Sequence, residues 1–500
     1  MQSDLLDLAE TNRIAALAGL DSKRQDTLGQ FFTPVRAATL IASLPRLPED
    51  GRIKVLDPGA GTGVLSAAIV SRVLAERPNL AVHVVAVECD EALTPHLTAT
   101  LEACKSAGQG RVTFEVVAAD FITASTGINR DQRLAGFDLA IQNPPYAKLA
   151  ASSPARVAVR EIGSDAPNLY AAFLALAASV LSPGGQSVAI TPRSFCNGPY
   201  FGAFRSALLE RIALDRVHVF ESRSTVFADT GVLQENLIVS GTKNGVRDTV
   251  VLSASNGHDD DVSYRCVPYD DVIHPDDPNK FIRIATNDED TVVAEKMMSL
   301  PDTLTSLGVT ASTGKIVDFR SRECLHAERV EAGVPLIYPG NVRNGRVHWP
   351  QEIRKAQWFA PITEKDKKML APEGWYCVVK RFSSKEERRR IVAAVWSPED
   401  ISGPVAFENH INVFHNGGEG LDQELACGLS VWLNSSLVDK FFRTFSGHTQ
   451  VNATDLRSLR FPSSDALRQL GRRVPGRNFP DQDQVDALVE EALSSDSVPA

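Results

Sequence analysis

The chain has 500 residues, which is too long for one hydrophobic core, so we expect at least two domains. Its 43% hydrophobic residues are typical of a soluble protein, and no apolar run reaches the roughly 18 residues that cross a membrane. The net charge of −10 does not exclude nucleic acid as a partner, because a total can hide a local basic face.

Two further features bear on compartment and metal content. The first ten residues lack the basic-then-apolar order of a secretory signal. The seven cysteines are scattered without any Cys-x-x-Cys spacing, which argues against a zinc site and against a disulfide framework. We therefore expect a cytoplasmic protein without a metal ion and without a membrane partner.

Short apolar runs alternate with helix-like segments in the first half of the chain. The strand-like runs are residues 53–57, 83–88, 112–118, 137–141 and 187–191, and the helical segments are 64–75, 91–104 and 168–181. This alternation predicts a mainly parallel, doubly wound α/β sheet. Two later strand-like runs, at residues 217–219 and 236–240, indicate that the sheet ends in a hairpin.

The pattern changes after this sheet, and we divide the chain into four parts. We expect a helical arm at residues 1–29 and the doubly wound domain at residues 30–245. Residues 246–300 are polar and contain prolines, which predicts a linker. Residues 301–500 mix short strands and helices without clean alternation, which predicts a second, mixed α/β domain.

A glycine-rich turn, VLDPGAGTG at residues 55–63, follows the first strand. Asp57 closes the strand, and Gly59 and Gly61 allow a bound ligand to approach the backbone closely. Open α/β sheets bind ligands beyond the carboxyl ends of their strands, where this turn lies. Dinucleotide enzymes have similar turns, and some glycine-rich turns are purely structural, so the turn alone does not identify the ligand.

Acidic residues at the next two strand ends narrow the interpretation. Glu88 ends the second strand, where its carboxylate can accept both ribose hydroxyls of an adenosine. Asp120 can accept from the adenine amine while the ring of Phe121 packs on the base. Taken singly, each residue could be a helix cap or a core ring, but together they predict an adenosine-containing cofactor.

The fourth strand ends in Asn-Pro-Pro-Tyr, and here the chain resembles a family, the gamma-class adenine-N6 DNA methyltransferases of the TaqI type in restriction-modification systems. The matching pieces are GQFFTP (residues 29–34), DPGAGTG (57–63), Glu88, Asp120-Phe121, NPPY (143–146) and the helix-to-strand segment 168–185. The resemblance implies a Rossmann-like methyltransferase domain, S-adenosyl-L-methionine as cofactor and double-stranded DNA as substrate. It also implies a cognate restriction endonuclease that acts as a separate protein.

The chemistry of an aromatic amine explains why such a loop is needed. The amine is a poor nucleophile because its lone pair is delocalised into the ring. Hydrogen bonds to the Asn143 side-chain oxygen and the Pro144 carbonyl would favour a tetrahedral nitrogen, and the prolines hold these acceptors in place. Tyr146 would stack on a base that has been flipped out of the duplex. Without the upstream signals, the same loop would be a rigid turn with a capping Asn.

The resemblance assigns three more residues. It implies a second aromatic across the base pocket, and Phe227 occupies the matching place, although a Phe there could equally belong to the core. It also implies that the GQFFTP segment holds the methionine end of the cofactor, for which Phe31 and Thr33 are the candidates.

The second half carries the densest mixture of aromatic and basic residues, WYCVVKRFSSKEERRR at residues 375–390. Lys380 and Arg381 are our candidates for DNA contacts, and this domain would recognise the target sequence. A solvated charged face is the alternative, because Glu386 and Glu387 interrupt the basic run.

Two other functions remain open. NPPY also occurs in methyltransferases that act on a protein glutamine or an RNA base, although these enzymes are usually shorter and lack GQFFTP. A non-catalytic DNA-specificity subunit would retain the fold, but the intact NPPY loop argues against it.

Overall fold

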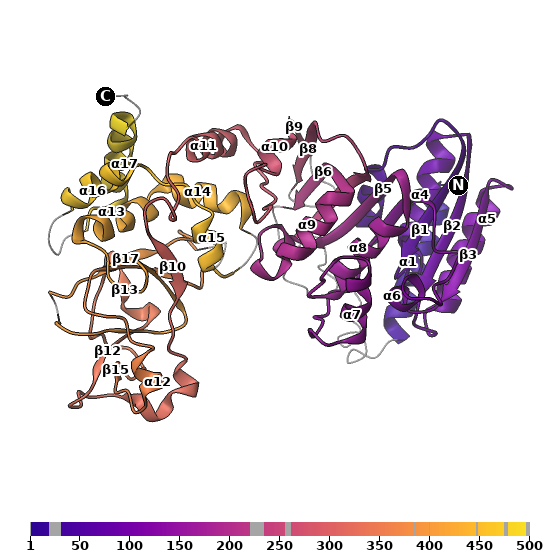
Figure 1. Cartoon of the computed structure of the whole chain (residues 1–500). Coiled ribbons are helices and arrows are strands. Elements are labelled where there is room, and N and C mark those ends of the chain that lie inside the picture. The colour runs from indigo at the N-terminus through magenta and orange to yellow at the C-terminus, as the bar shows by residue number, and fades with distance from the viewer. Residues whose placement is uncertain are drawn as a thin grey trace. The chain divides into compact units, whose positions relative to one another are not determined.

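The computed structural model of the chain describes residues 2–19, 32–220, 235–255, 262–383, 387–399, 401–446, 449–474 and 479–496. It divides into two compact units, Met1–Thr286 and Asn287–Ala500, which are described separately below (Figure 1).

The described residues of the first unit form a nine-stranded sheet in the order β3-β2-β1-β4-β5-β7-β6-β8-β9. Its strands are β1 (Asp50–Pro58), β2 (Asn79–Glu88), β3 (Val112–Ala118), β4 (Phe137–Gln142), β5 (Leu181–Pro192), β6 (Ile212–Phe220), β7 (Asn236–Lys243), β8 (Thr249–Ser255) and β9 (Ser263–Pro268). Strands β1 to β5 pair in parallel, whereas β7 is antiparallel to both β5 and β6. The doubly wound α/β fold and its antiparallel hairpin are confirmed. The strand order reverses between β1 and β4, which is where such sheets bind ligands.

Helices cover both faces of this sheet (Figure 1). One layer contains α1 (Gln2–Gly19), α3 (Val35–Ser43), α4 (Val64–Glu76) and α5 (Thr94–Ala107); the other contains α6 (Phe121–Ser125), α7 (Pro154–Glu161), α8 (Leu169–Val180), α9 (Gly202–Arg211) and α10 (Tyr269–Val272). Successive residues of a strand point to opposite faces, so Val55 belongs to the first core and Leu56 to the second. The sheet is therefore buried on both sides, which explains its nearly continuous apolar strands.

The linker predicted at residues 246–300 is wrong. Strand β8 pairs in parallel with β6 and β9 pairs with β8, so both strands extend the sheet. Val250 and Leu252 are buried, so β8 has an apolar face that packs into the core. This strand was missed in the sequence because the segments on either side of it are polar. The acidic stretch at residues 259–261 lies outside the described residues. The unit boundary falls later, between Thr286 and Asn287.

A separate N-terminal arm at residues 1–29 is also not what the structure shows in the described part of that range. Helix α1 contacts α4 and α5, and Leu5 and Ala9 are buried in the same core as Val55. The helix belongs to the first unit because its small apolar face fits against two helices that the sheet already positions.

The second unit is a mixed α/β domain, as predicted. Its described strands form a six-stranded sheet in the order β10-β19-β16-β17-β14-β13 and a four-stranded sheet in the order β11-β15-β12-β18. The strands are β10 (Thr310–Thr313), β11 (Leu325–His326), β12 (Val334–Ile337), β13 (Val342–Arg343), β14 (Gly345–Val347), β15 (Trp358–Phe359), β16 (Tyr376–Lys380), β17 (Ala393–Trp396), β18 (Ala406–Phe407) and β19 (Ile411–His415). The helices are α11 (Asp288–Met298), α12 (Glu364–Lys367), α13 (Gln423–Leu433), α14 (Ser436–Phe445), α15 (Ala453–Arg457), α16 (Ser464–Arg472) and α17 (Gln482–Asp496).

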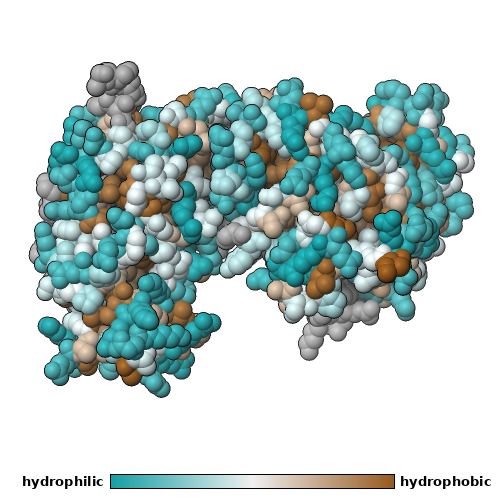
Figure 2. All heavy atoms as spheres, in the orientation of Figure 1, coloured by the Kyte–Doolittle hydropathy of each residue, from teal (hydrophilic) through white to brown (hydrophobic). Residues whose placement is uncertain are grey.

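Apolar side chains are concentrated in the interiors of the units. Hydrophilic residues predominate on the face shown in Figure 2, where the hydrophobic residues form small, separated groups. Large side chains such as Trp396 and Trp432 are almost completely buried in the second unit. In the part of the chain that the structure describes, no helix has the length and apolar character needed to span a bilayer.

Candidate active site

The glycine-rich turn connects β1 to α4 and has a backbone that few other residues could adopt. Gly59, Gly61 and Gly63 have φ values of +70°, +57° and +82°, in the left-handed region that glycine enters without strain. A Cβ at Gly59 would lie 3.3 Å from the ring of Phe173, so the turn also needs a small residue for close packing.

Glu88 holds this turn against the end of β2. One carboxylate oxygen, Oε2, accepts from the backbone N–H of Gly61 at 2.8 Å, and Oε1 accepts from the N–H of Asp90 at 2.8 Å. Burial raises the pKa of Glu88, while these backbone donors oppose the shift. Each carboxylate oxygen can accept a second hydrogen bond, so the carboxylate retains acceptors for a diol.

A cavity opens at the carboxyl ends of β1, β2, β3 and β4, where the strand order reverses. Six of the predicted cofactor and catalytic residues line it: Thr33, Gly59, Gly61, Glu88, Asp120 and Asn143. Apolar side chains complete the walls: Phe32, Leu65, Leu93, Leu169 and Phe173. Carboxylates set among apolar walls suit a ligand with hydroxyl and amine donors on an aromatic or aliphatic frame.

Asn143 is oriented by hydrogen bonds from two directions. Its Nδ2 donates to the Thr33 hydroxyl at 3.0 Å, and its Oδ1 accepts from the Tyr146 hydroxyl at 3.3 Å. Thr33 is 110 residues away in sequence, so the first bond joins the GQFFTP and NPPY segments. Burial raises the pKa of Tyr146, which keeps the phenol protonated and able to donate.

The NPPY loop is also anchored to the start of α8. Leu169 donates its N–H to the Ala147 carbonyl at 2.8 Å, and Leu149 donates to the Pro167 carbonyl at 2.9 Å. The ring of Tyr146 meets that of Tyr170 edge-on, with centroids 6.2 Å apart and planes at 86°. Together with the buried Pro144, these contacts fix the loop against the start of α8.

Two predicted cofactor residues lie elsewhere. Asp57 is buried, and its Oδ2 accepts hydrogen bonds from the Ser66 hydroxyl at 2.6 Å and from the Ser66 N–H at 3.2 Å. It therefore joins the end of β1 to the start of α4 and stabilises the turn between them. Phe121 is 2% exposed and packs against Phe173, with ring centroids 5.1 Å apart. It is Phe173 that lines the cavity. Phe31 and Phe227 lie outside the described residues.

The sequence reasoning missed the aromatic walls of the cavity. Phe32 stands beside the predicted Phe31, and Phe173 lies on α8 one turn after Leu169. Residues four apart share a helix face, so Phe173 follows from Leu169 once the structure shows that Leu169 lines the cavity. No local pattern distinguishes Phe31 from Phe32 at the end of GQFF.

The basic stretch at residues 375–390 is only partly available for DNA. Arg390 is 1% exposed, its Nε and Nη2 donate to the hydroxyls of Ser383 and Ser446, and it belongs to the interior of the second unit. Lys380, the last residue of β16, is half-buried, and burial lowers its pKa. Arg381 donates through Nη1 to the Asn409 carbonyl at 3.1 Å. The basic residues of this predicted DNA-contact segment are thus divided between buried, structural positions such as Arg390 and more accessible ones.

The chain is similar in sequence to known restriction-modification methyltransferases. The model of the family described as "Eco57I restriction-modification methylase" matches residues 97–227. The type II methyltransferase M.PstI of Providencia stuartii is 39% identical over 97% of this chain and 97% of its own length, and M.BsuBI of Bacillus subtilis is 41% identical over 99% of both. The chain belongs to the type II restriction-modification methyltransferases. A solved structure of the type IIL enzyme MmeI with DNA covers 89% of this chain and 69% of its own, with a TM-score of 0.52; its 10% identity shows the fold alone.

Membership of this methyltransferase family supports S-adenosyl-L-methionine as the cofactor, and the cavity fits it. Glu88 and Asp120 offer carboxylates for the ribose hydroxyls and the adenine amine, and Phe173 offers a ring for the base. Gly59 and Gly61 leave room at the turn that a side chain would fill. The residues present are thus of the kinds that an adenosine-containing sulfonium requires.

Asp57 predicts a pH dependence of stability for this methyltransferase. Burial raises its pKa to about 7, from a usual value of 3.8, although Ser66 donates to it. The folded protein therefore holds a proton that the unfolded chain releases, and stability falls as pH rises from about 4 to about 7. The side chain of Asp57→Asn cannot ionise, so this variant should not lose stability in this way. The difference in free energy of unfolding, variant minus wild type, should therefore increase by up to about 1.4 kcal/mol per pH unit in this window. Urea unfolding without cofactor at pH 5, 6, 7 and 8 measures the difference; a constant difference would contradict the raised pKa.

Proposed function

We propose that this type II methyltransferase transfers a methyl group from S-adenosyl-L-methionine to N6 of adenine at a specific sequence in duplex DNA, and so protects host DNA from a separate cognate endonuclease. The observation that carries the proposal is the orientation of Asn143 at the edge of the cavity, with Nδ2 on Thr33 and Oδ1 on the side of Tyr146. The Asn143 Oδ1 has a second lone pair, which can accept a hydrogen bond from the N6 amine of the target adenine.

The loop would activate the amine by accepting a hydrogen bond from each of its two N–H groups. The Asn143 Oδ1 and the Pro144 carbonyl would bind one N–H each, which favours a tetrahedral nitrogen with a localised lone pair. S-adenosyl-L-methionine bound beside Asn143 would supply an electrophilic methyl group on sulfur. The N6–methyl bond would form as the sulfur–methyl bond breaks, and one amine proton would leave to water. Asn143 is an acceptor rather than a base, because its amide does not take up the proton.

The position of the loop supports a mechanism in which the target base is flipped out of the duplex. An amine inside a stacked duplex cannot reach acceptors in a cavity, so the adenine must rotate out of the helix. The ring of Tyr146, held edge-on against Tyr170, would stack on the extruded base. We propose Phe227 for the opposite side of the base.

The cofactor would lie along the carboxyl ends of the strands, with its adenosine at Glu88 and Asp120 and its methionine end at Thr33. Glu88 would accept from the ribose hydroxyls and Asp120 from the adenine amine, with Phe173 rather than Phe121 against the base. Thr33, with Phe31, would hold the methionine end next to Asn143. Asp57 would act through Ser66, by positioning the turn rather than by touching the cofactor.

We assign target recognition to the second unit. Every residue with a proposed role in the chemistry belongs to the first unit, within Met1–Thr286. The aromatic-basic segment that contains Lys380 and Arg381 belongs to the second unit, where Lys380 would contact phosphate and contribute to affinity.

Methylation of DNA is tested directly by adding purified protein and labelled S-adenosyl-L-methionine to plasmid DNA, total RNA and protein extract. We expect label in DNA alone, and long-read sequencing of that DNA should show N6-methyladenine in one short sequence context. Label in RNA or protein would favour the alternative methyltransferases that share NPPY. Methylcytosine in place of methyladenine would overturn the assignment of the target base.

A further inference from the structure

Three backbone segments of the second unit meet at the end of β16. The N–H of Arg381 donates to the His410 carbonyl at 2.9 Å, and the Val451 N–H donates to the Arg381 carbonyl at 2.7 Å. Phe382 forms a β-bridge with Gln450. The segments bring together five side chains that local sequence does not connect, which we call the His410 cluster: Arg381, Phe382, Asn409, His410 and Gln450.

His410 is held in a fixed orientation by a buried carboxylate. Glu408 is 1% exposed; its Oε1 lies 2.5 Å from Nδ1 of His410, and its Oε2 accepts the His410 N–H at 2.9 Å. The His410 side chain is 46% exposed. A carboxylate bound at Nδ1 fixes the tautomer and the ring plane, and it leaves Nε2 for another partner.

Phe382 and Arg381 flank this imidazole. Phe382 is 45% exposed, and its ring packs on His410, with centroids 5.0 Å apart and planes at 47°. Arg381 donates to the Asn409 carbonyl at 3.1 Å and to Gln450 Oε1 at 3.4 Å. Within the described residues, its Nε and the Asn409 side-chain oxygen are buried without hydrogen-bond partners. The hydrogen bonds to Asn409 and Gln450 hold the Arg381 guanidinium in one orientation within the cluster.

The chemistry of the cluster favours base edges over phosphate. Arginine recognises guanine and Asn or Gln recognises adenine through paired hydrogen bonds in the major groove, and an exposed aromatic ring contacts the thymine methyl group. The buried Glu408 carboxylate behind the imidazole would repel a phosphate, whereas a base edge carries no net charge. The side chains are also held by contacts, unlike the flexible lysines that typically contact phosphate.

We propose that the His410 cluster contacts base edges of the recognition sequence in duplex DNA and determines part of the sequence specificity. This inference rests on the proposed function, because it takes the substrate to be DNA. It assigns Arg381 to base recognition and leaves Lys380 as the phosphate contact.

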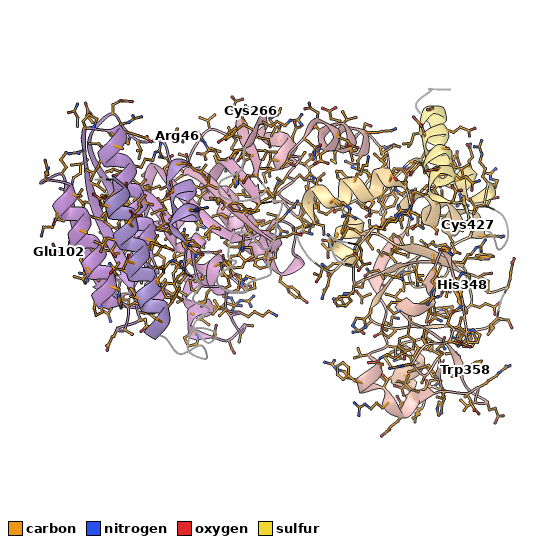
Figure 3. All side chains as sticks on the ribbon, turned by 180° about the vertical axis from the view of Figure 1, so that it is seen from behind. Arg46, Glu102, Cys266, His348, Trp358 and Cys427 are labelled. Atoms are coloured by element: carbon orange, nitrogen blue, oxygen red, sulfur yellow. The ribbon has the colours of Figure 1, made fainter. Side chains whose placement is uncertain are left out.

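The test selects bound duplexes from a randomised DNA pool, with the demethylated cofactor product present so that no methyl transfer is required. Phe382→Ala and His410→Ala should lose preference at one or two positions of the wild-type consensus, with affinity for the consensus reduced about 10- to 100-fold. Lys380→Ala should weaken binding to all sequences equally and lower the salt slope by about one. His348→Ala, which removes another exposed histidine of this unit, is the matched control (Figure 3).

Several results would overturn the inference. One is an unchanged consensus with both Phe382→Ala and His410→Ala; another is a uniform loss over all sequences, as for a phosphate contact. An equal effect of His348→Ala would also count against it. Unchanged thermal melting and cofactor binding by the variants would exclude misfolding as the cause. Phe382→Leu, which keeps an apolar side chain, serves as a second variant at that position. Because selection needs no methyl transfer, a wild type that enriches a consensus but methylates no adenine would overturn the proposed function without affecting this inference.

Discussion

Asn143→Ala should reduce the rate of methyl transfer by at least about 100- to 1000-fold, the range seen when one preorganised hydrogen-bonding group is removed from an active site. Affinity for S-adenosyl-L-methionine should change little. The side chain would act on the target amine, and its removal leaves Glu88 and the glycine-rich turn intact. Single-turnover methylation of plasmid DNA measures the rate, and equilibrium titration measures cofactor binding.

Two further variants make this experiment specific. Asn129→Ala removes an exposed asparagine from a loop of the same unit and should leave the rate unchanged. Thr33→Val retains the shape but removes the hydroxyl that accepts from Asn143 Nδ2. With the cofactor saturating, so that any loss of cofactor affinity is compensated, its rate of transfer should fall about tenfold, the value of one neutral hydrogen bond. Transfer by Asn143→Ala at the wild-type rate would show that the amide oxygen does not activate the amine.

Glu88→Ala should raise the dissociation constant of S-adenosyl-L-methionine by about 10- to 100-fold, as expected for the loss of a charged hydrogen-bond acceptor. Glu88 is 5% exposed, and its carboxylate would accept hydrogen bonds from the ribose hydroxyls. It also holds the Gly61 N–H at 2.8 Å, so the turn would lose an anchor as well. Calorimetric titration with the cofactor measures this loss directly.

A conservative variant and a surface control separate these two roles of Glu88. Glu88→Gln keeps an oxygen for Gly61 but loses the charge, so its affinity should lie between those of the wild type and Glu88→Ala. Glu102→Ala removes an exposed glutamate on the outer side of α5 and should bind the cofactor normally (Figure 3). An unchanged dissociation constant for Glu88→Ala would place the ribose elsewhere in the cavity.

The local sequence was sufficient to predict the parallel strands of the sheet, its antiparallel hairpin and several residues that line the cavity, but not β8 and β9. Apolar runs of strand length, each followed by a helix, specify a parallel sheet, and the carboxyl ends of such strands lie at one edge. Glu88, Asp120 and Asn143 follow these runs directly, so their convergence required no knowledge of distant contacts. The glycines after Asp57 were also predictable, because a positive φ is a requirement of the turn itself and not of distant contacts.

Tertiary structure alone decided which side chains face the cavity and which support it. Asp57 turns towards Ser66, and Phe173 rather than Phe121 reaches the cavity, because packing between α8 and the sheet sets those directions. The same holds for Thr33, whose hydroxyl meets an amide 110 residues away. Motifs and periodicity report neighbours along the chain, whereas these contacts depend on long-range packing that short sequence patterns do not encode.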